Sequence, residues 1–244
     1  MATLQNSLMR TLRGWALALG SVLAAPLLQA ASYPQLDVDS IVAPAPAPID
    51  QERLALAVGL LAQYANTYPL RFDSQDDLIV ALRDATELSQ RLRTHLEVAN
   101  PEPQILLLSA QLNTQAWRMG MKQGAELAFE QFSRLLRQSP DDMRANYLLG
   151  SFLSEFDEAG GLARRYLIRA DQGGIPEAAY TLGMLSIGDR DIPAAKVYLE
   201  RYAIQAGIGD EDFKRLLRAV SSGRVRVNFS RLPALPAGVV ERLP

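Results

Sequence analysis

The 244-residue sequence contains no cysteine, which excludes disulfides, thiol nucleophiles and a lipid attached through cysteine. His95 is its only histidine, so a metal site built from several histidines is excluded as well. Lysine is scarce, with only Lys122, Lys196 and Lys214, and the formal net charge is −2. That balance provides no basic surface for nucleic acid. We expect a protein held together by packing, with no cofactor, no metal and no nucleic-acid partner.

The sequence also lacks an apolar run long enough to cross a membrane. Near the N-terminus, Arg10 and Arg13 precede the uncharged stretch from Trp15 to Leu28, and small residues follow around Ala30. This stretch is shorter than the roughly 20 residues of a membrane-spanning helix. The layout predicts a secretory signal peptide over residues 1–30, cleaved near Ala30, with an uncleaved anchor as the alternative. We therefore expect a periplasmic or secreted protein whose mature form has no integral membrane span.

Two segments near the ends of the chain do not follow a helical pattern. Residues 31–49 are rich in alternating alanine and proline, which favours extended backbone and predicts a semi-rigid spacer. A mature N-terminus without a role is the alternative. Residues 223–244 carry four arginines and several prolines and break the helical period. They predict an extended tail that either caps the last helix or docks on a partner.

Between these segments, residues 50–222 have helical period throughout. In the segment after Ser74, for example, the residues Leu78, Leu82, Ala85, Leu88, Leu92 and Leu96 form one apolar stripe, and Ser74 is a typical N-cap. Ser139 and Pro140 are likewise typical of a helix start. The predicted helical segments are 51–68, 75–98, 102–119, 124–138, 141–155, 159–171, 176–187, 191–206 and 210–221. The fold class is therefore all-α, made of short antiparallel helices joined by short turns.

A repeat with an interval of 33 residues organises these helices. The pattern A-x-Y-x-L-G occurs in "MRANYLLGSFL" and again in "PEAAYTLGMLS", which places Gly150 and Gly183 at equivalent positions. The second helices repeat a small residue followed by larger ones on one face, in the sets Ala128, Phe132 and Leu135; Ala163, Leu167 and Ala170; and Ala195, Leu199 and Tyr202. A helix pair of this length buries its apolar faces only by stacking on neighbours, so the repeat predicts a helix-turn-helix solenoid. The glycines are expected where helices cross closely.

The repeated units resemble the tetratricopeptide repeat family, whose unit carries Leu-Gly in its first helix, alanine and a large residue in its second, and proline at its end. Ala128, Phe132, Leu135 and Pro140 match the end of one unit, and the Leu-Gly pair at Gly150 opens the next. The resemblance covers residues 105–206 most clearly, and a related Sel1-like repeat would give the same architecture. Residues 51–98 are interpreted as a further, degenerate helix pair.

In this family, the first helices line a concave groove that holds a peptide or a partner helix. Carried onto this sequence, the resemblance implies partner-binding roles for Arg144, Tyr147, Ser151, Ser154, Glu177, Tyr180, Met184, Ile187, Asn113 and Trp117. Such a groove would be aromatic and apolar with few charges, and it has no lysine to clamp a carboxylate. The alternative is that Tyr147 and Tyr180 are framework residues.

No arrangement of residues in the sequence points to catalysis. His95 is expected to be structural, at the end of its helix. The acidic clusters at Asp76, Asp141 and Asp210 each open a predicted helix, where carboxylates accept hydrogen bonds from free backbone amides. We therefore expect a non-catalytic protein.

Two functional hypotheses remain. The first is a periplasmic scaffold or adaptor that binds a protein partner in a cell-envelope assembly. The second is a solenoid that binds a glycan or peptidoglycan strand, with a weak hydrolase activity as a variant. A glycan groove would flank its aromatic residues with Asp, Asn and Gln, and few such residues are present here. The protein partner is therefore favoured, and the oligomeric state is left open.

Overall fold

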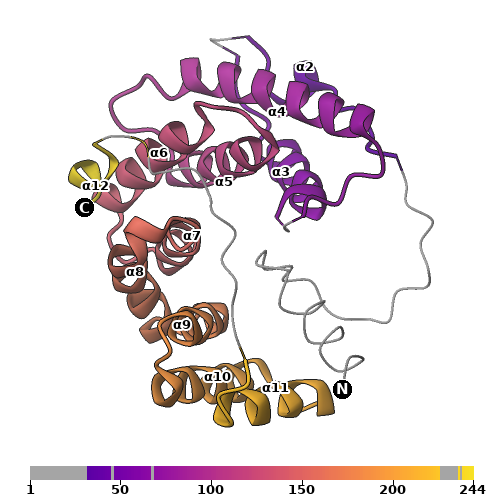
Figure 1. The fold of residues 1–244 in the computed structure, drawn as a ribbon. Coiled ribbons are helices and arrows are strands. Elements are labelled where there is room, and N and C mark those ends of the chain that lie inside the picture. The colour runs from indigo at the N-terminus through magenta and orange to yellow at the C-terminus, as the bar shows by residue number, and fades with distance from the viewer. Residues whose placement is uncertain (1–31, 45–46, 67–68, 226–235, 237) are drawn as a thin grey trace. The chain divides into compact units, whose positions relative to one another are not determined.

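The computed structural model describes residues 32–44, 47–66, 69–225, 236 and 238–244 (Figure 1). The predicted signal peptide and half of the predicted C-terminal tail, residues 226–235 and 237, lie outside these residues. The described chain divides into two compact units. We call Ser139–Glu241 the C-terminal unit, and residues 32–138 with Arg242–Pro244 the N-terminal unit, and we describe each by itself.

Helices are the regular elements of the described part of the chain, apart from one isolated bridge between Val42 and Ile49. They are α2 (Val38–Ile41), α3 (Gln51–Ala65), α4 (Gln75–His95), α5 (Pro103–Met119), α6 (Gly124–Gln138), α7 (Met143–Leu153), the 3₁₀ turn η1 (Asp157–Ala159), α8 (Gly160–Gln172), α9 (Pro176–Gly188), α10 (Ile192–Ala206), α11 (Glu211–Ser221) and α12 (Val239–Arg242). In the C-terminal unit neighbouring helices pack in succession, and in the N-terminal unit α3, α4 and α6 each pack on α5. The predicted all-α, solenoid-like fold class is confirmed.

Local capping interactions set most of the helix ends where the sequence predicts them. The Ser74 hydroxyl accepts the Asp77 amide at the start of α4, and Asp210 does the same for Phe213 at the start of α11. Gly207 ends α10 in the left-handed conformation, with φ of 66°. The predicted start of α7 near Pro140 was wrong. The Asp142 carboxylate is the N-cap and accepts the Ala145 amide at 2.9 Å, so the helix begins at Met143.

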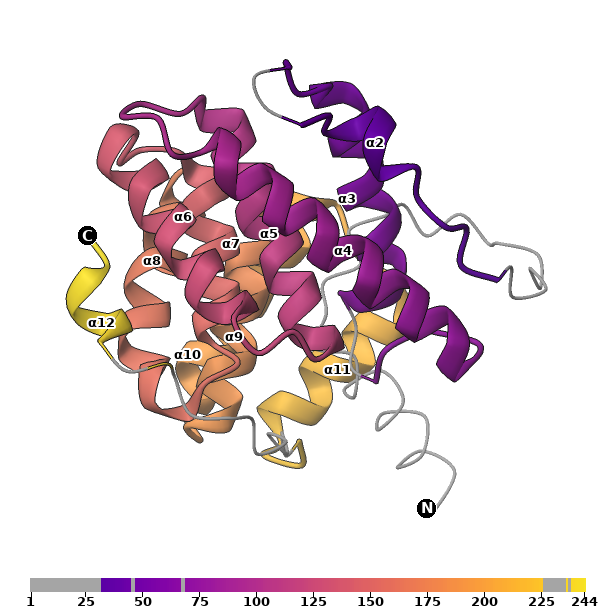
Figure 2. The same cartoon turned by 90° about the horizontal axis from the view of Figure 1, so that it is seen from above.

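In the N-terminal unit, α5 is the central helix. Helices α3, α4 and α6 each pack against α5, and residues 106–110 and 112–116 of α5 are buried (Figure 2). The apolar stripe of α4 meets this core through Leu88 and Leu92, which are fully buried. Residues 51–98 were interpreted as a degenerate helix pair. The structure instead gives α3 and α4 a common partner in α5, because both turn their apolar faces toward it.

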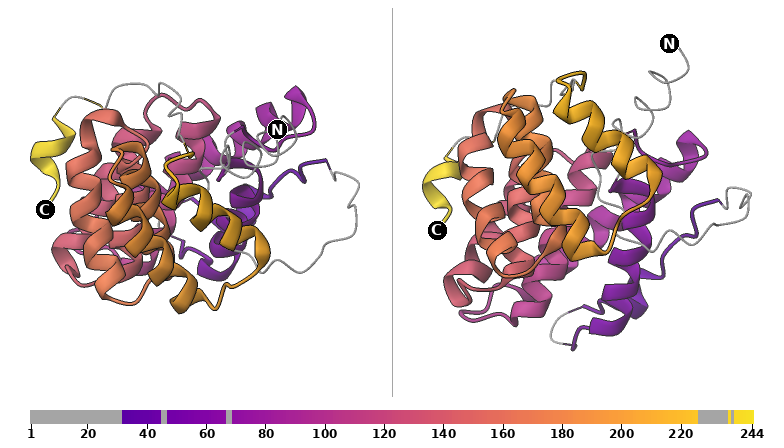
Figure 3. Two further views of the ribbon diagram at one scale, coloured as in Figure 1. Left: turned by 60° about the horizontal axis from the view of Figure 1, so that its bottom comes forward. Right: turned by 90° about the horizontal axis from the view of Figure 1, so that it is seen from below.

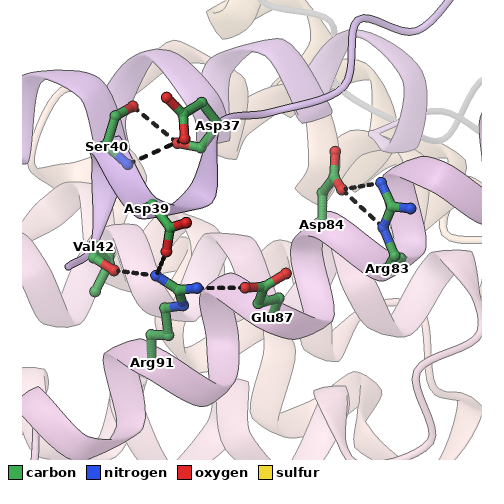
Figure 4. Close-up of polar contacts among 8 residues, drawn as sticks. All are labelled: Asp37, Asp39, Ser40, Val42, Arg83, Asp84, Glu87 and Arg91. Carbon is green, nitrogen blue, oxygen red and sulfur yellow. Dashed lines mark hydrogen bonds and ion pairs between the residues drawn. The ribbon is translucent and has the colours of Figure 1, made fainter. Parts of the chain in front are cut away.

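Residues 32–44 fold along α4 and do not form a spacer. The Asp77 carboxylate accepts the Tyr33 amide at 3.0 Å, and the Asp84 carboxylate accepts the Leu36 amide at 2.8 Å. Arg91 of α4 donates to Asp39 and to the Val42 carbonyl (Figure 4). The buried apolar side chains of this segment are Tyr33, Val38, Ile41 and Val42. The spacer interpretation is therefore corrected for this segment, because its apolar residues belong to the core that α3, α4 and α5 also form.

In the C-terminal unit, α7 packs on α8, α8 on α9, α9 on α10 and α10 on α11 (Figure 1). The repeated glycines lie where each pair of helices is closest. A Cβ atom on Gly150 would come within 2.8 Å of Leu167 Cγ, and one on Gly183 within 2.8 Å of Leu199 Cγ. Gly150 also faces the Ala163 carbonyl, and Gly183 faces that of Ala195. The predicted repeat register is confirmed, because each first-helix glycine meets the predicted small and large residues of its second helix.

Candidate partner-binding face

The residues assigned to the groove divide into a buried and an accessible set. Those with almost no exposed surface are Asn113 (0% exposed), Tyr147 (6%), Ser154 (6%), Met184 (2%) and Ile187 (3%). Those with accessible surface are Arg144, which is exposed, and Trp117, Ser151, Glu177 and Tyr180, which are partly exposed. The buried five are packing residues in this structure. The prediction of partner contact is kept for the accessible set.

Asn113 is buried because it joins a polar network between helices of the N-terminal unit. Its side-chain oxygen accepts the Ser89 hydroxyl of α4 at 2.6 Å, and its amide nitrogen donates to Gln131 of α6 at 2.9 Å. It also donates to the Ser109 carbonyl one turn back. Asn113 therefore links α4, α5 and α6, and it is corrected from a groove residue to an interhelical connector.

In the C-terminal unit, the buried groove residues lie on helices that are covered from several sides. Helix α9 packs against α7, α8 and α10, and every residue from Thr181 to Ile187 is buried. In an internal repeat, the first helix packs against the second helix of its own repeat and against the helices of the preceding repeat. Only a narrow strip of its surface therefore stays accessible. Ser154 is the C-cap of α7, and its hydroxyl donates to the Ser151 carbonyl at 2.6 Å. Met184, Ile187 and Ser154 thus have local structural roles.

Tyr180 is accessible and lies in a row of three aromatic side chains from successive helices. Its ring centroid is 5.1 Å from that of Tyr202 on α10, and the Tyr202 centroid is 5.8 Å from that of Phe213 on α11. The rings are tilted at 56° and 57°, and all three side chains are partly exposed. We call Tyr180, Tyr202 and Phe213 the aromatic strip. In Figure 3 the helices that carry it run side by side, from orange to yellow.

The strip is partly buried, and charged residues lie on the same helices. Burial raises the pKa of the Tyr180 phenol, and burial together with the negative charge of Glu177 raises that of Tyr202. Both phenols are therefore neutral at physiological pH. Arg201 of α10 pairs with the buried carboxylate of Asp171 on α8 and lies 5.6 Å from the centre of the Tyr198 ring.

Tyr202 and Phe213 were not predicted as site residues. Tyr202 was assigned to the packing set of the second helices, where the preceding units carry Leu135 and Ala170. A large aromatic residue at that position is the signal that could have identified it, since it reaches beyond α10 toward the next helix. Phe213 is the first large apolar residue of α11. Leu216 and Leu217 of the same helix are partly exposed, and Val220 is buried.

His95 and the acidic residues at the helix starts make local structural contacts. His95 Nε2 lies 3.1 Å from the Ala43 carbonyl oxygen and so helps to hold the N-terminal segment on α4. Asp142 and Asp210 cap their helices as expected. Among the described residues there is no group of three or more His, Cys, Asp or Glu side chains placed to hold a metal ion.

None of the helices in the described part of the chain has the length and apolar character needed to cross a membrane. Comparison of the chain with protein-family models, with curated proteins and with solved structures found no match in any of the three.

Proposed function

We propose that this chain is an exported, non-catalytic helical-repeat scaffold whose C-terminal unit holds a segment of a protein partner in a cell-envelope assembly. The observation that carries this proposal is the aromatic strip. Tyr180, Tyr202 and Phe213 come from three successive helices, lie ring against ring and keep part of their surface accessible. Aromatic residues with a polar rim are the side chains that most often anchor protein interfaces.

The chemistry of the strip favours an apolar helical or extended segment as the ligand. Three adjacent rings offer a large, rigid apolar surface, and their ordering costs little side-chain entropy because each has few rotatable bonds. The charged groups on the same helices, Glu177 and Arg201, would lie at the rim of such a contact. Arg144 and Ser151 on α7 are two of the predicted groove residues; they lie in the same unit and are accessible. The tetratricopeptide-like repeat pattern and the expected signal peptide provide the remaining support for an envelope scaffold.

Site-specific photo-crosslinking in the native host tests this function. A photoreactive phenylalanine analogue at Tyr202 keeps a ring in the strip, and the matched control carries the same analogue at Ile204, which is 82% exposed on the same helix. We expect one discrete protein adduct from position 202 that is absent from position 204 and is lost in a Tyr180→Ala background. Identical adducts from both positions, or none from position 202, would contradict the proposal.

A further inference from the structure

The N-terminal unit contains a pocket with a volume of about 380 Å³ between α4 and the start of α6. The α4 side contributes Thr86, Ser89, Gln90 and Arg93, which lie on one helix face because their spacing is 0, 3, 4 and 7. Ser89 is fixed by its hydrogen bond to Asn113, and Thr86 by its hydrogen bond to the Leu82 carbonyl at 2.7 Å. This wall is therefore well ordered at its base, with Gln90 and Arg93 exposed above it.

The opposite wall combines a cation with apolar side chains. Met121, Lys122 and Gln123 come from the turn between α5 and α6, and Leu127 comes from the first turns of α6. Helix α6 begins at Gly124, so its N-terminus adds partial positive charge next to Lys122. Met121 and Leu127 supply an apolar surface in the same pocket.

Arg93 and Lys122, the two cations of the pocket, are unpaired among the described residues, whereas the other arginines of α4 are paired. Arg83 pairs with Asp84, and Arg91 pairs with Asp39 and Glu87. Neither Arg93 nor Lys122 forms an ion pair or a side-chain hydrogen bond within the residues that the structure describes, and none of the residues lining the pocket is acidic. Two unneutralised cations facing one pocket create a local positive potential that favours an anion.

From this arrangement we propose that the pocket binds a small organic acid, with the carboxylate held by Arg93 and Lys122 and the apolar part of the ligand against Met121 and Leu127. The guanidinium group of Arg93 can donate two parallel hydrogen bonds to a carboxylate, and the amides of Gln90 and Gln123 can complete its coordination. The volume lies in the lower range of small-molecule sites, so it accommodates a ligand larger than an inorganic ion. This inference is independent of the partner-binding function, because the pocket lies entirely in the N-terminal unit.

Ligand-observed NMR titration of the full chain tests the proposal with four probes: phenylpropionate, phenylpropanol, acetate and inorganic phosphate. Phenylpropionate carries both the charge and the apolar body, and each of the other probes lacks one of them. We expect phenylpropionate to bind about tenfold or more tightly than each of the others. Equal affinity for phosphate would mean that only charge is recognised, and no phenylpropionate binding up to about 10 mM would also overturn the proposal.

The variant Arg93→Gln/Lys122→Gln should lose about tenfold or more in phenylpropionate affinity, because it removes both charge-assisted contacts. Both side chains are exposed and unpaired, so the melting temperature should stay the same. Arg71→Gln is the matched control, because it removes an exposed cation of the same unit outside the pocket. Gln123→Glu is a second variant that places a negative charge at the pocket without shortening a side chain, and it should weaken binding too. Unchanged affinity in either pocket variant, or an equal loss in Arg71→Gln, would refute the assignment.

Discussion

Gly183 of α9 lies directly against Leu199 of α10, and a Cβ atom at Gly183 would be 2.8 Å from Leu199 Cγ and 2.9 Å from Cδ2. The same relationship joins Gly150 of α7 to Leu167 of α8, also at 2.8 Å. At both crossings the absence of a side chain lets two helix backbones approach more closely than any larger residue permits. The repeat visible in the sequence is therefore a repeat of helix crossings.

Replacing Gly183 by leucine should overpack this crossing and lower the free energy of unfolding by about 1–3 kcal/mol. Circular dichroism melting measures the effect. Gly161→Leu is the matched control, because Gly161 lies in α8 of the same unit and a Cβ there would meet nothing within 4 Å. If both variants melt at the same temperature, Gly183 does not limit the approach of α9 and α10.

Tyr147 and Tyr180 occupy equivalent repeat positions but should respond differently to truncation. Tyr147 is 6% exposed, so Tyr147→Ala should leave a cavity and cost about 3 kcal/mol or more. Tyr180 is partly exposed, and Tyr180→Ala should cost clearly less. Urea denaturation of the two variants beside the wild type gives the comparison, and equal losses would show that both side chains are framework residues.

Asp84 should hold the N-terminal segment on α4. Its carboxylate is 2% exposed, accepts the Leu36 amide at 2.8 Å and pairs with Arg83. Asp84→Ala removes that acceptor, so amide hydrogen exchange should accelerate in residues 33–42 more than in α5. Asp76→Ala is the control, because Asp76 is exposed on the same helix. Uniform acceleration across the N-terminal unit would indicate global destabilisation instead of local release.

The tyrosines whose phenol pKa is raised should make the protein less stable at alkaline pH. Burial raises the pKa of Tyr166, Tyr180 and Tyr202, and for Tyr33 the negative charge of Asp84 adds to the effect of burial. A folded-state pKa above the unfolded value of about 10 contributes stability below that pH, and this stability is lost as the pH rises through the folded-state pKa. The urea concentration at the unfolding midpoint should therefore decrease as the pH is raised from about 8 to about 11. Tyr180→Phe should show a smaller fall, and a fall equal to that of the wild type would exclude Tyr180 as a contributor.

The sequence by itself determined the helices, because the contacts that begin and end them lie within a few residues. The capping contacts of Ser74 and Asp210 span three residues, and Gly207 ends α10 through its own backbone conformation. The spacing of Gly150 and Gly183 likewise predicted where α7 and α9 meet their partner helices, since a close crossing leaves no room for a side chain.

Only the tertiary structure decided which of these residues remain accessible. The side chains of Asn113, Tyr147 and Met184 suit a groove as well as a packed interface, and only the neighbouring helices settled their burial. The sequence did not indicate that the N-terminal segment packs on α4. Its partners, Asp77 and Asp84, lie more than 40 residues away along the chain. The aromatic strip also required the fold, because Tyr180, Tyr202 and Phe213 are separated by turns whose geometry the helical period does not specify. These contacts join segments that are distant in the sequence, and they depend on how whole helices pack, which the repeat pattern specifies only at the glycine crossings.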